Sequence, residues 1–245
     1  MSTIRLYVDS PIVVGQTIAL DSGRARYVSR VLRLRRGDQV VLFDGSGPEF
    51  HGTLVTLGKN AADIDVTEEI SANRESPLRI HLLQGVSRGD RMDHVVQKTT
   101  ELGVARITPV LTEYSVVKLT GDRAAKRVHH WQGIAASACE QCGRNVLPVI
   151  GEPVALRTAL GSFVGQPGTR IFLDPRGNAG SAGQLPEDNA LTLLIGPEGG
   201  FSAEETELAA AAGFAATRFG PRVLRTETAA VAAIAMLQSR FGDLS

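Results

Sequence analysis

Two turns near the C-terminus combine glycine and proline with charged side chains, as ligand-binding loops do. The first turn spans residues 195–202 and contains Glu198, and the second spans residues 219–228 and contains Arg225. Each turn follows a short apolar, strand-like run and precedes an alanine-rich helical run, which predicts two loops at the carboxyl edge of a parallel sheet. Because ligands of open α/β folds bind at that edge, we expect the active site to lie between the two turns.

The residue types of the first turn favour a ligand with little negative charge. Its glycines let the backbone approach a ligand closely, and Ser202 with Glu205 has the pattern of a capping box at a helix start. Glu198 would repel a di- or triphosphate, and no Lys-Ser/Thr pair follows the glycines as a P-loop requires. An adenosine that carries a cationic sulfonium, as in S-adenosylmethionine, fits such a turn. For each turn taken alone, a strand-turn-helix corner without a ligand is the alternative.

The composition predicts a soluble, globular protein without an overall charge bias. Of 245 residues, 43% are hydrophobic and 21% are charged, and Lys plus Arg equals Asp plus Glu at 26 each. The length suits one large or two small domains, and the charge balance restricts any RNA site to a local patch. The N-terminus lacks the apolar core of a signal peptide, and no apolar run approaches the roughly 20 residues of a membrane span. We therefore expect a cytoplasmic protein.

The first 73 residues are expected to form a small β-barrel domain. Turn residues such as Asp44-Gly45 separate its short strand-like runs, and a helical run over residues 22–36 interrupts them. The strand-like runs span residues 5–9, 17–20, 39–44, 50–57 and 62–69. The polar tract over residues 71–77 is the expected linker between this domain and the rest of the chain.

Residues 74–245 have the alternating pattern of an α/β domain. The runs are, in order, strand-like 78–86, helical 90–102, strand-like 106–111, helical 122–142, strand-like 170–173 and then the two turns described above. This order predicts a parallel sheet covered by helices. Residues 177–187 are expected to form a polar loop.

Two groups of basic residues are candidate RNA contacts. Six arginines fall within the thirteen residues 24–36, enough to contact several phosphates. A solvated helix face paired with Asp21 and Asp38 is the alternative interpretation of this group. Aromatic residues make up only 5% of the chain, so base-stacking platforms are not expected. The selected candidates are Arg24, Arg26, Arg30 and Arg33 in the first group and Arg88, Arg91, Lys98 and Arg144 in the second.

The two cysteines, Cys139 and Cys142, exclude a disulfide scaffold but form a single C-x-x-C. With His129 and His130 upstream they could supply four zinc ligands, or they could be a redox pair. Because the surrounding positions continue a helical apolar stripe in which both cysteines would pack, we predict no metal. The alanine-rich run over residues 229–237 is likewise expected to be core or dimer interface.

Seven segments of the chain, in their order along the sequence, resemble the bacterial small-subunit ribosomal RNA methyltransferase E family. This family methylates N3 of a uridine in the decoding region of 16S rRNA. The N-terminal region adds the expected elements Val31-Leu32-Arg33 and Leu42-Phe43-Asp44-Gly45. The seven segments are Arg74-Glu75-Ser76-Pro77-Leu78, Ser87-Arg88-Gly89-Asp90-Arg91-Met92, Gln97-Lys98 with Glu101-Leu102-Gly103-Val104, Ala138-Cys139-Glu140-Gln141-Cys142-Gly143-Arg144-Asn145, residues 194–205, residues 220–228 and Phe241-Gly242-Asp243-Leu244.

The resemblance implies a PUA-like N-terminal domain and a SPOUT methyltransferase domain that binds S-adenosylmethionine at a C-terminal trefoil knot. It also implies a homodimer that acts on 16S rRNA within the small ribosomal subunit. Three knot loops bind the cofactor in this superfamily. On this sequence they would supply Leu173, Asp174, Pro175, Ile195, Gly196, Pro197, Gly199, Gly200, Phe219, Gly220, Val223, Leu224 and Thr226.

Methylation of uridine N3 needs an unpaired base and the loss of its weakly acidic proton. Arg225 is the candidate that stabilises the developing uracil anion, and Glu198 is the candidate base or substrate-orienting acceptor. The alternatives are a salt bridge of Arg225 with Glu198 or Glu227, capping of turn amides by Glu198, and loss of the proton to hydroxide or solvent.

Three other functions stay open at this stage. A ribose 2′-O or tRNA methyltransferase would have the same fold, and a non-catalytic RNA-binding or ribosome-assembly factor could retain it. A protein that binds nucleotide phosphates is disfavoured by Glu198.

Overall fold

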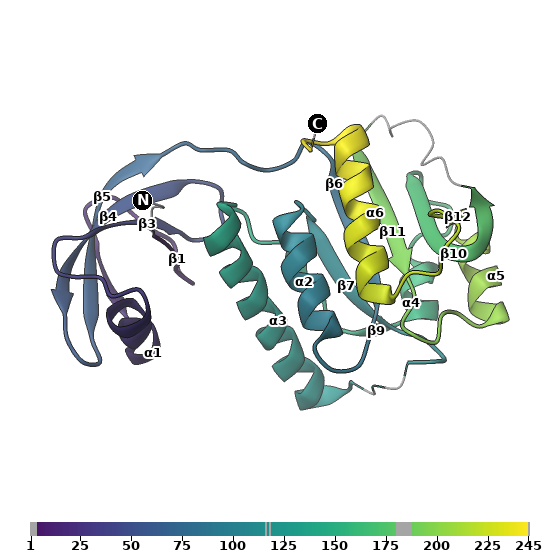
Figure 1. Ribbon diagram of the computed structural model, residues 1–245, viewed down its shortest axis with the longest axis horizontal. Helices are drawn as coiled ribbons and strands as arrows, with labels where there is room; N and C mark the ends of the chain where they lie inside the picture. The colour runs from purple at the N-terminus through teal and green to yellow at the C-terminus, as the bar shows by residue number, and fades with distance from the viewer. Residues whose placement is uncertain (1–3, 116, 118, 180–187, 245) are drawn as a thin grey trace. The chain divides into compact units, whose positions relative to one another are not determined.

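The computed structural model describes residues 4–115, 117, 119–179 and 188–244, which form two compact units (Figure 1). The first unit comprises Met1–Glu75 and Cys139–Leu147, and the second comprises Ser76–Ala138 and Pro148–Ser245. In the described part of the chain, no helix combines the length and apolarity that crossing a bilayer requires.

The first unit contains a curled five-stranded sheet with the order β1-β3-β4-β5-β2. β1 runs parallel to β3, and the other three pairs are antiparallel. The curled sheet agrees in part with the predicted small β-barrel, but β1 and β2 are not paired with each other among the described residues, so the sheet stays open between them. The strands are β1 (Arg5–Tyr7), β2 (Thr17–Leu20), β3 (Gln39–Phe43), β4 (Glu49–Leu57) and β5 (Ala62–Ile70).

A short helix packs against the inner face of this sheet. Asp21 begins α1 (Ser22–Arg26) by accepting the amide hydrogens of Gly23 and Arg24 at 2.7 and 3.0 Å. The chain continues as a π-helical turn, η1 (Tyr27–Val31). The helix therefore ends before residue 36, the predicted limit, because Arg33 takes a left-handed conformation with φ of 55°.

The segment that follows residue 138 completes the first unit. Glu140 accepts the amide hydrogen of Tyr7 at 2.8 Å, and the Asn145 side chain donates to the Ala72 carbonyl at 2.9 Å. Cys139 is buried in the last helical turn, and its thiol donates to the Val146 carbonyl. This segment, one of those that carry the family resemblance, thus holds the edge of the first unit together.

The second unit contains a seven-stranded sheet with the order β12-β10-β11-β6-β7-β8, and β9 also pairs with β7. Every pair is parallel, which confirms the predicted parallel sheet. The two-residue strands β8 and β9 were not predicted. The strands are β6 (Arg79–Gly85), β7 (Arg106–Leu111), β8 (Val149–Ile150), β9 (Val154–Ala155), β10 (Thr169–Ala179), β11 (Ala190–Ile195) and β12 (Ala215–Arg218).

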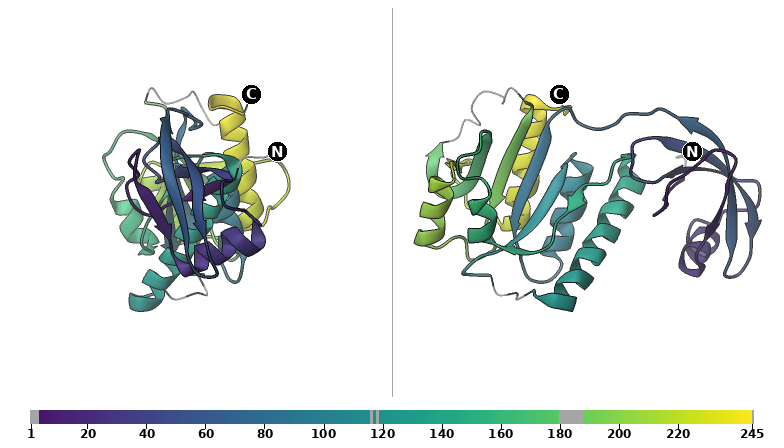
Figure 2. Two further views of the ribbon diagram at one scale, coloured as in Figure 1. Left: turned by 90° about the vertical axis from the view of Figure 1, so that its left-hand side faces the viewer. Right: turned by 180° about the vertical axis from the view of Figure 1, so that it is seen from behind.

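Helices cover both faces of this sheet because its central strands are apolar on both sides (Figures 1 and 2). On β6, Leu82 packs toward Val96, Trp131 and Ile234, whereas the adjacent Leu83 packs toward Leu160 on the other face. The helices of the first face are α2 (Arg91–Glu101), α3 (Gly121–Cys142) and α6 (Thr226–Phe241), and those of the second are α4 (Leu156–Gly161) and α5 (Ala203–Ala211).

Strand β10 is longer than predicted and irregular. Both Leu173 and Asn178 pair with Thr217 of β12, so the residues between them leave the sheet as an excursion. Gly177 is required there, because a Cβ atom at this position would lie 2.8 Å from the backbone of Ala216 and Thr217. Of the loop predicted over 177–187, the first three residues thus belong to β10, and residues 180–187 lie outside the described residues.

Candidate active site

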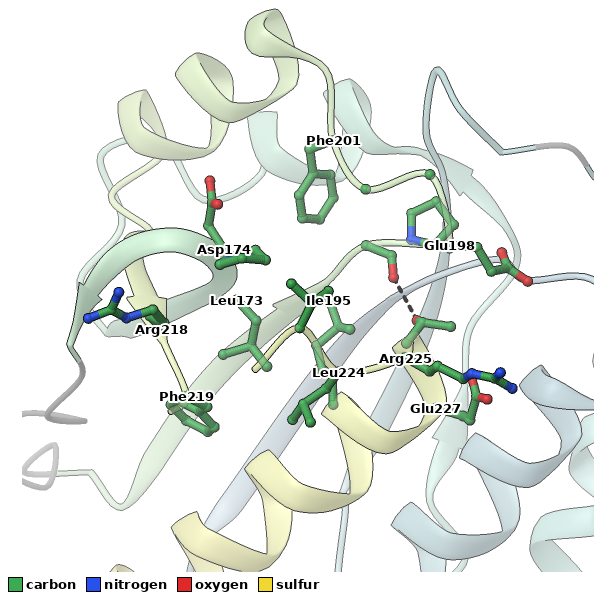
Figure 3. Close-up of a pocket in the computed structure, with 18 of the residues that line it drawn as sticks. Leu173, Asp174, Ile195, Glu198, Phe201, Arg218, Phe219, Leu224, Arg225 and Glu227 are labelled. Atoms are coloured by element: carbon green, nitrogen blue, oxygen red, sulfur yellow. Dashed lines mark hydrogen bonds between the residues drawn. The ribbon is translucent and has the colours of Figure 1, made fainter. Parts of the chain in front are cut away.

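Three segments at the carboxyl edge of the second sheet enclose a cavity of about 720 Å³. They are the excursion of β10, the turn after β11 and the turn after β12 (Figure 3). The volume is within the range of small-molecule and cofactor sites. The lining residues are Arg91, Leu173, Asp174, Pro175, Arg176, Ile195, Gly196, Pro197, Glu198, Gly199, Gly200, Phe201, Thr217, Arg218, Phe219, Arg222, Val223, Leu224, Arg225, Thr226, Glu227 and Ala229.

Hydrogen bonds between its own residues hold the turn after β11 in place. The predicted capping box is confirmed: the Ser202 hydroxyl accepts from the Glu205 amide at 3.3 Å, and the Glu205 carboxylate accepts from the Ser202 amide at 3.0 Å. Gly200 has φ of 69° and donates its amide hydrogen to the Pro197 carbonyl at 2.9 Å. This backbone conformation favours glycine and directs the turn over the cavity.

The turn also packs directly on the end of β6. A Cβ atom at Gly85 would lie 2.4 Å from the Pro197 nitrogen, so only glycine allows this approach. Close by, the buried Thr226 hydroxyl donates to the Gly196 carbonyl at 2.6 Å and accepts from the Gln84 amide group at 2.9 Å. The start of α6, the first turn and β6 are therefore fixed to one another.

The excursion of β10 carries a buried carboxylate. Asp174 accepts the amide hydrogen of Arg176 at 2.8 Å and two hydrogen bonds from its guanidinium at 3.1 Å. The side-chain bond from Arg176 lowers the pKa of Asp174 more than its burial raises it. The carboxylate is thus charged at neutral pH.

The cavity has an apolar centre and two polar ends (Figure 3). Leu173, Ile195 and Leu224 lie in the middle, and Asp174 and Arg218 lie at one end. Glu198, Arg225 and Glu227 lie together at the other end. An elongated ligand with an apolar body and polar groups at both ends suits this arrangement.

At the second polar end, Arg91 of α2 pairs with both carboxylates. Its guanidinium contacts Glu198 Oε1, and its Nε lies 3.9 Å from Glu227 Oε2. Burial alone would raise the pKa of Glu198, but the amide of Arg88, the Glu198 amide itself and Arg91 lower it. Glu198 therefore stays ionised at neutral pH and is a weak proton acceptor.

Arg225 differs from Arg91 in its surroundings. It immediately precedes α6, is exposed, and lines the cavity. In the described part of the chain no carboxylate forms an ion pair with it, so the alternative salt bridge with Glu198 or Glu227 is not formed. Its guanidinium is available to a ligand.

Comparison with known proteins decides the class of this chain. Residues 74–238 match the family model of an RNA methyltransferase domain, and residues 20–67 match that of an RNA methyltransferase PUA domain. The ribosomal RNA small subunit methyltransferase E of Buchnera aphidicola subsp. Schizaphis graminum is 37% identical over 98% of each chain. The chain belongs to the ribosomal RNA small subunit methyltransferase E family.

Two further relatives agree with membership of the methyltransferase E family. The protein of this name from Bacillus subtilis is 28% identical over 90% of this chain and 89% of its own length. A crystal structure of the Neisseria gonorrhoeae family member, bound to S-adenosyl methionine, has 39% identity and a TM-score of 0.90, and each chain is covered completely. The PUA match falls within the first unit and the methyltransferase match includes the whole cavity.

The structure brings together nearly all residues that the methyltransferase E resemblance placed at the cofactor site. Arg225, Glu198 and every predicted cofactor-binding residue except Gly220 line the cavity. Phe201, Arg222 and Glu227 were not predicted to line the cavity, although all three lie inside the resembling segments. Arg176, Thr217, Arg218 and Ala229 were not predicted either, because their positions depend on how β10, β12 and α6 meet.

The residues expected to contact RNA fall into different environments. Arg26, Arg30, Arg33 and Arg88 are exposed, and no described carboxylate forms an ion pair with them. Four others are paired with carboxylates: Arg24 with Glu140 at 3.1 Å, Arg91 as above, Lys98 with Glu101 at 2.9 Å, and Arg144, which is buried, with Glu75 at 2.6 Å.

Proposed function

We propose that this chain is an S-adenosylmethionine-dependent methyltransferase that methylates N3 of a uridine in the decoding region of 16S rRNA. The observation that carries the proposal is the cavity between the two turns, with its apolar centre and, at one end, Arg225, which pairs with no carboxylate among the described residues. Family membership supports the reaction class, and the relative from Neisseria gonorrhoeae crystallised with S-adenosyl methionine supports the cofactor.

The residues of the cavity fit S-adenosylmethionine. Leu173, Ile195 and Leu224 offer an apolar surface for the adenine, and the backbone of the turn after β11 offers amide and carbonyl groups. Glu198 adds a negative charge that suits a sulfonium and disfavours a nucleotide phosphate. When bound, this cofactor supplies a methyl carbon to uridine N3, and the electron pair of the broken carbon–sulfur bond remains on sulfur.

Arg225 and Glu198 would perform different parts of the reaction. As N3 loses its proton, negative charge spreads to O2 and O4 of uracil, and the Arg225 guanidinium is free to donate hydrogen bonds to it. Glu198 is held by Arg88 and Arg91 in its ionised form, which supports an orienting role over that of proton acceptor. The proton is then released to water or hydroxide.

The proposal includes the partners and topology implied by the family. The first unit, with Arg26, Arg30 and Arg33 exposed, would bind phosphates of the RNA, and Arg88 would do so from the second unit. The C-terminal segments would form the SPOUT trefoil knot, and two copies of the chain would associate. The small ribosomal subunit in the cytoplasm would be the substrate.

One experiment tests cofactor, substrate and position together. The purified protein is incubated with radiolabelled S-adenosylmethionine and small ribosomal subunits that lack the modification, and the labelled nucleoside is identified by digestion and mass spectrometry. The expected product is 3-methyluridine in 16S rRNA. Label in a ribose or in tRNA would assign a different SPOUT reaction. Absence of both transfer and cofactor binding would favour a non-catalytic assembly factor.

A further inference from the structure

A second hollow, of about 580 Å³, adjoins the charged end of the cavity. It is lined by Arg88, Gly89, Asp90, Arg91, His94 and Glu227. Arg91 and Glu227 also line the cavity itself, so the two spaces share one wall. A molecule in the second hollow would therefore lie next to a ligand in the cavity.

The shared wall is a network of charges. Arg91 contacts Glu198 of the turn after β11 and lies 3.9 Å from Glu227 in the first turn of α6. Glu227 Oε2 is covered and accepts no hydrogen bond from the described residues. Because Arg91 faces two carboxylates at once, its charge is already compensated, which makes it a poor contact for an RNA phosphate.

The remaining groups around the hollow have mixed charge. Arg88 is exposed and has no carboxylate partner among the described residues, while its amide hydrogen donates to Glu198 at 3.2 Å. Asp90 precedes α2 without capping it through its side chain, so its carboxylate is available as an acceptor. His94 is exposed one helical turn later.

The mixed charge of the residues that line the hollow favours one type of ligand. A simple anion would be attracted to Arg88 but repelled by the carboxylates of Asp90 and Glu227. A nucleotide within an RNA strand presents both kinds of group, because its phosphate accepts hydrogen bonds whereas its ribose 2′-hydroxyl donates one. The volume is within the range of pockets that bind small molecules.

We propose, on the basis of the methyltransferase function above, that this hollow is the subsite for the target nucleotide. Arg88 binds its phosphate, and Asp90 accepts a hydrogen bond from its ribose 2′-hydroxyl. The base then extends past Glu227 toward the cavity, where its N3 meets the methyl donor. Arg91 is a positioning residue that fixes Glu198 and Glu227 where the two spaces meet. The role of Arg91 thus differs from the RNA contact expected from the sequence.

The first test compares two arginine variants of equal charge. Arg88→Gln removes the proposed phosphate contact, and Arg106→Gln removes an exposed arginine from β7 at the opposite, amino edge of the sheet. Arg88→Gln is expected to raise KM for the small subunit about 10-fold, the loss typical of one charge-assisted hydrogen bond, without changing the Kd for S-adenosylmethionine. Arg106→Gln is expected to change neither. Equal KM values for the two variants overturn the proposal.

A second test locates the nucleotide without relying on turnover. A decoding-region RNA fragment with 4-thiouridine in place of uridine is crosslinked to the protein by light in the presence of S-adenosylhomocysteine, and the modified peptide is sequenced. Crosslinks in residues 88–94 or at Glu227 support the subsite, and crosslinks found only elsewhere in the second unit overturn it. If these crosslinks form but the wild-type protein transfers no methyl group, the reaction is wrong and the subsite stands.

Discussion

The Thr226 hydroxyl donates a hydrogen bond of 2.6 Å to the Gly196 carbonyl and so ties the start of α6 to the turn after β11 (Figure 3). The same hydroxyl accepts a hydrogen bond from Gln84 of β6. This buried hydroxyl therefore links the start of α6 and the turn after β11 to the central strand β6. A side chain without the hydroxyl would break both hydrogen bonds.

Thr226→Val is therefore expected to lower stability and cofactor affinity together. Valine has the same shape, but it removes the donor to the Gly196 carbonyl and leaves the Gln84 amide group with only its bond to the Gly85 carbonyl, at a cost of about 1–3 kcal/mol. Thr226→Ser, which keeps the hydroxyl, is the matched control. Its loss of stability and of cofactor affinity should be less than half that of Thr226→Val. Urea unfolding and titration calorimetry with S-adenosylmethionine measure the two effects. A valine variant as stable as the wild type would show that the hydrogen bonds are dispensable.

The approach of Pro197 to Gly85 predicts a second sensitive position. Gly85→Ala places a Cβ atom 2.4 Å from the Pro197 nitrogen, and since the obstacle is backbone, the turn must move. We expect at least a 10-fold weaker Kd for S-adenosylmethionine, the cost of displacing a preformed ligand loop by a fraction of an ångström. Gly133→Ala in α3 is the control, because nothing lies within 4 Å of its added Cβ and alanine favours a helix. Unchanged cofactor affinity in Gly85→Ala would contradict the assigned cavity.

The different surroundings of Arg225 and Glu198 predict different kinetic defects. Arg225→Ala should reduce kcat by about 10²–10³-fold, as for the loss of one donor to a developing anion, with RNA affinity nearly unchanged. Glu198→Gln keeps the shape of the side chain and should reduce kcat less, without removing a limb from the pH–rate profile. Single-turnover methyl transfer between pH 6 and 9 measures both. Loss of an acid-side limb only in Glu198→Gln would make Glu198 the proton acceptor.

The sequence predicted those parts of the site that depend on local signals. Glycine, proline and the capping box of Ser202 and Glu205 identified both turns, and the alternation of strands and helices predicted the parallel sheet that places them at one edge. These features involve residues close together in the chain, so their types and spacing are enough to predict them.

The features of the site that the sequence did not predict depend on contacts between residues that are far apart in the chain. Arg91 lies 107 positions from Glu198, and no local pattern shows that this arginine meets a carboxylate of another loop. Arg144 was expected to contact RNA, yet its guanidinium is buried against Glu75, 69 positions away. The excursion of β10 likewise exists only because Leu173 and Asn178 pair with the same residue of β12.

The exposed arginines of the first unit predict a salt-dependent RNA affinity. Arg30→Gln with Arg33→Gln removes two cations that have no carboxylate partner among the described residues. If both contact phosphates, RNA Kd should rise and the slope of log K against log salt should decrease by about 1.5–2. Arg24, which pairs with Glu140, provides the comparison, because its replacement should alter the slope less. Fluorescence anisotropy from 50 to 300 mM salt measures the slopes. Identical slopes for the wild type and the double variant would mean that Arg30 and Arg33 do not contact RNA phosphates.

The buried carboxylate of Glu49 predicts how the first unit responds to acid. Its side chain is only 8% exposed and lies 2.6 Å from Arg5 and 2.8 Å from Arg74. Burial alone would raise the pKa of Glu49, but the hydrogen bonds and charges of Arg74 and Arg5 lower it below the ordinary value. A lowered pKa in the folded state means that Glu49 contributes stability above its unfolded pKa and loses that contribution as the pH falls through its folded pKa.

Glu49→Gln should therefore destabilise the protein strongly near pH 7 and progressively less in acid. Removing the charge leaves Arg5 and Arg74 without their carboxylate, which typically costs about 3–5 kcal/mol for a buried pair. The difference from the wild type should shrink below about pH 4, where the wild-type carboxyl also becomes protonated. Glu68→Gln is the control, because Glu68 is 67% exposed and its only ion pair in the described residues is with His51. Urea unfolding at pH 7, 5 and 3.5 measures the differences, and a deficit independent of pH would mean that shape, and not charge, explains the loss.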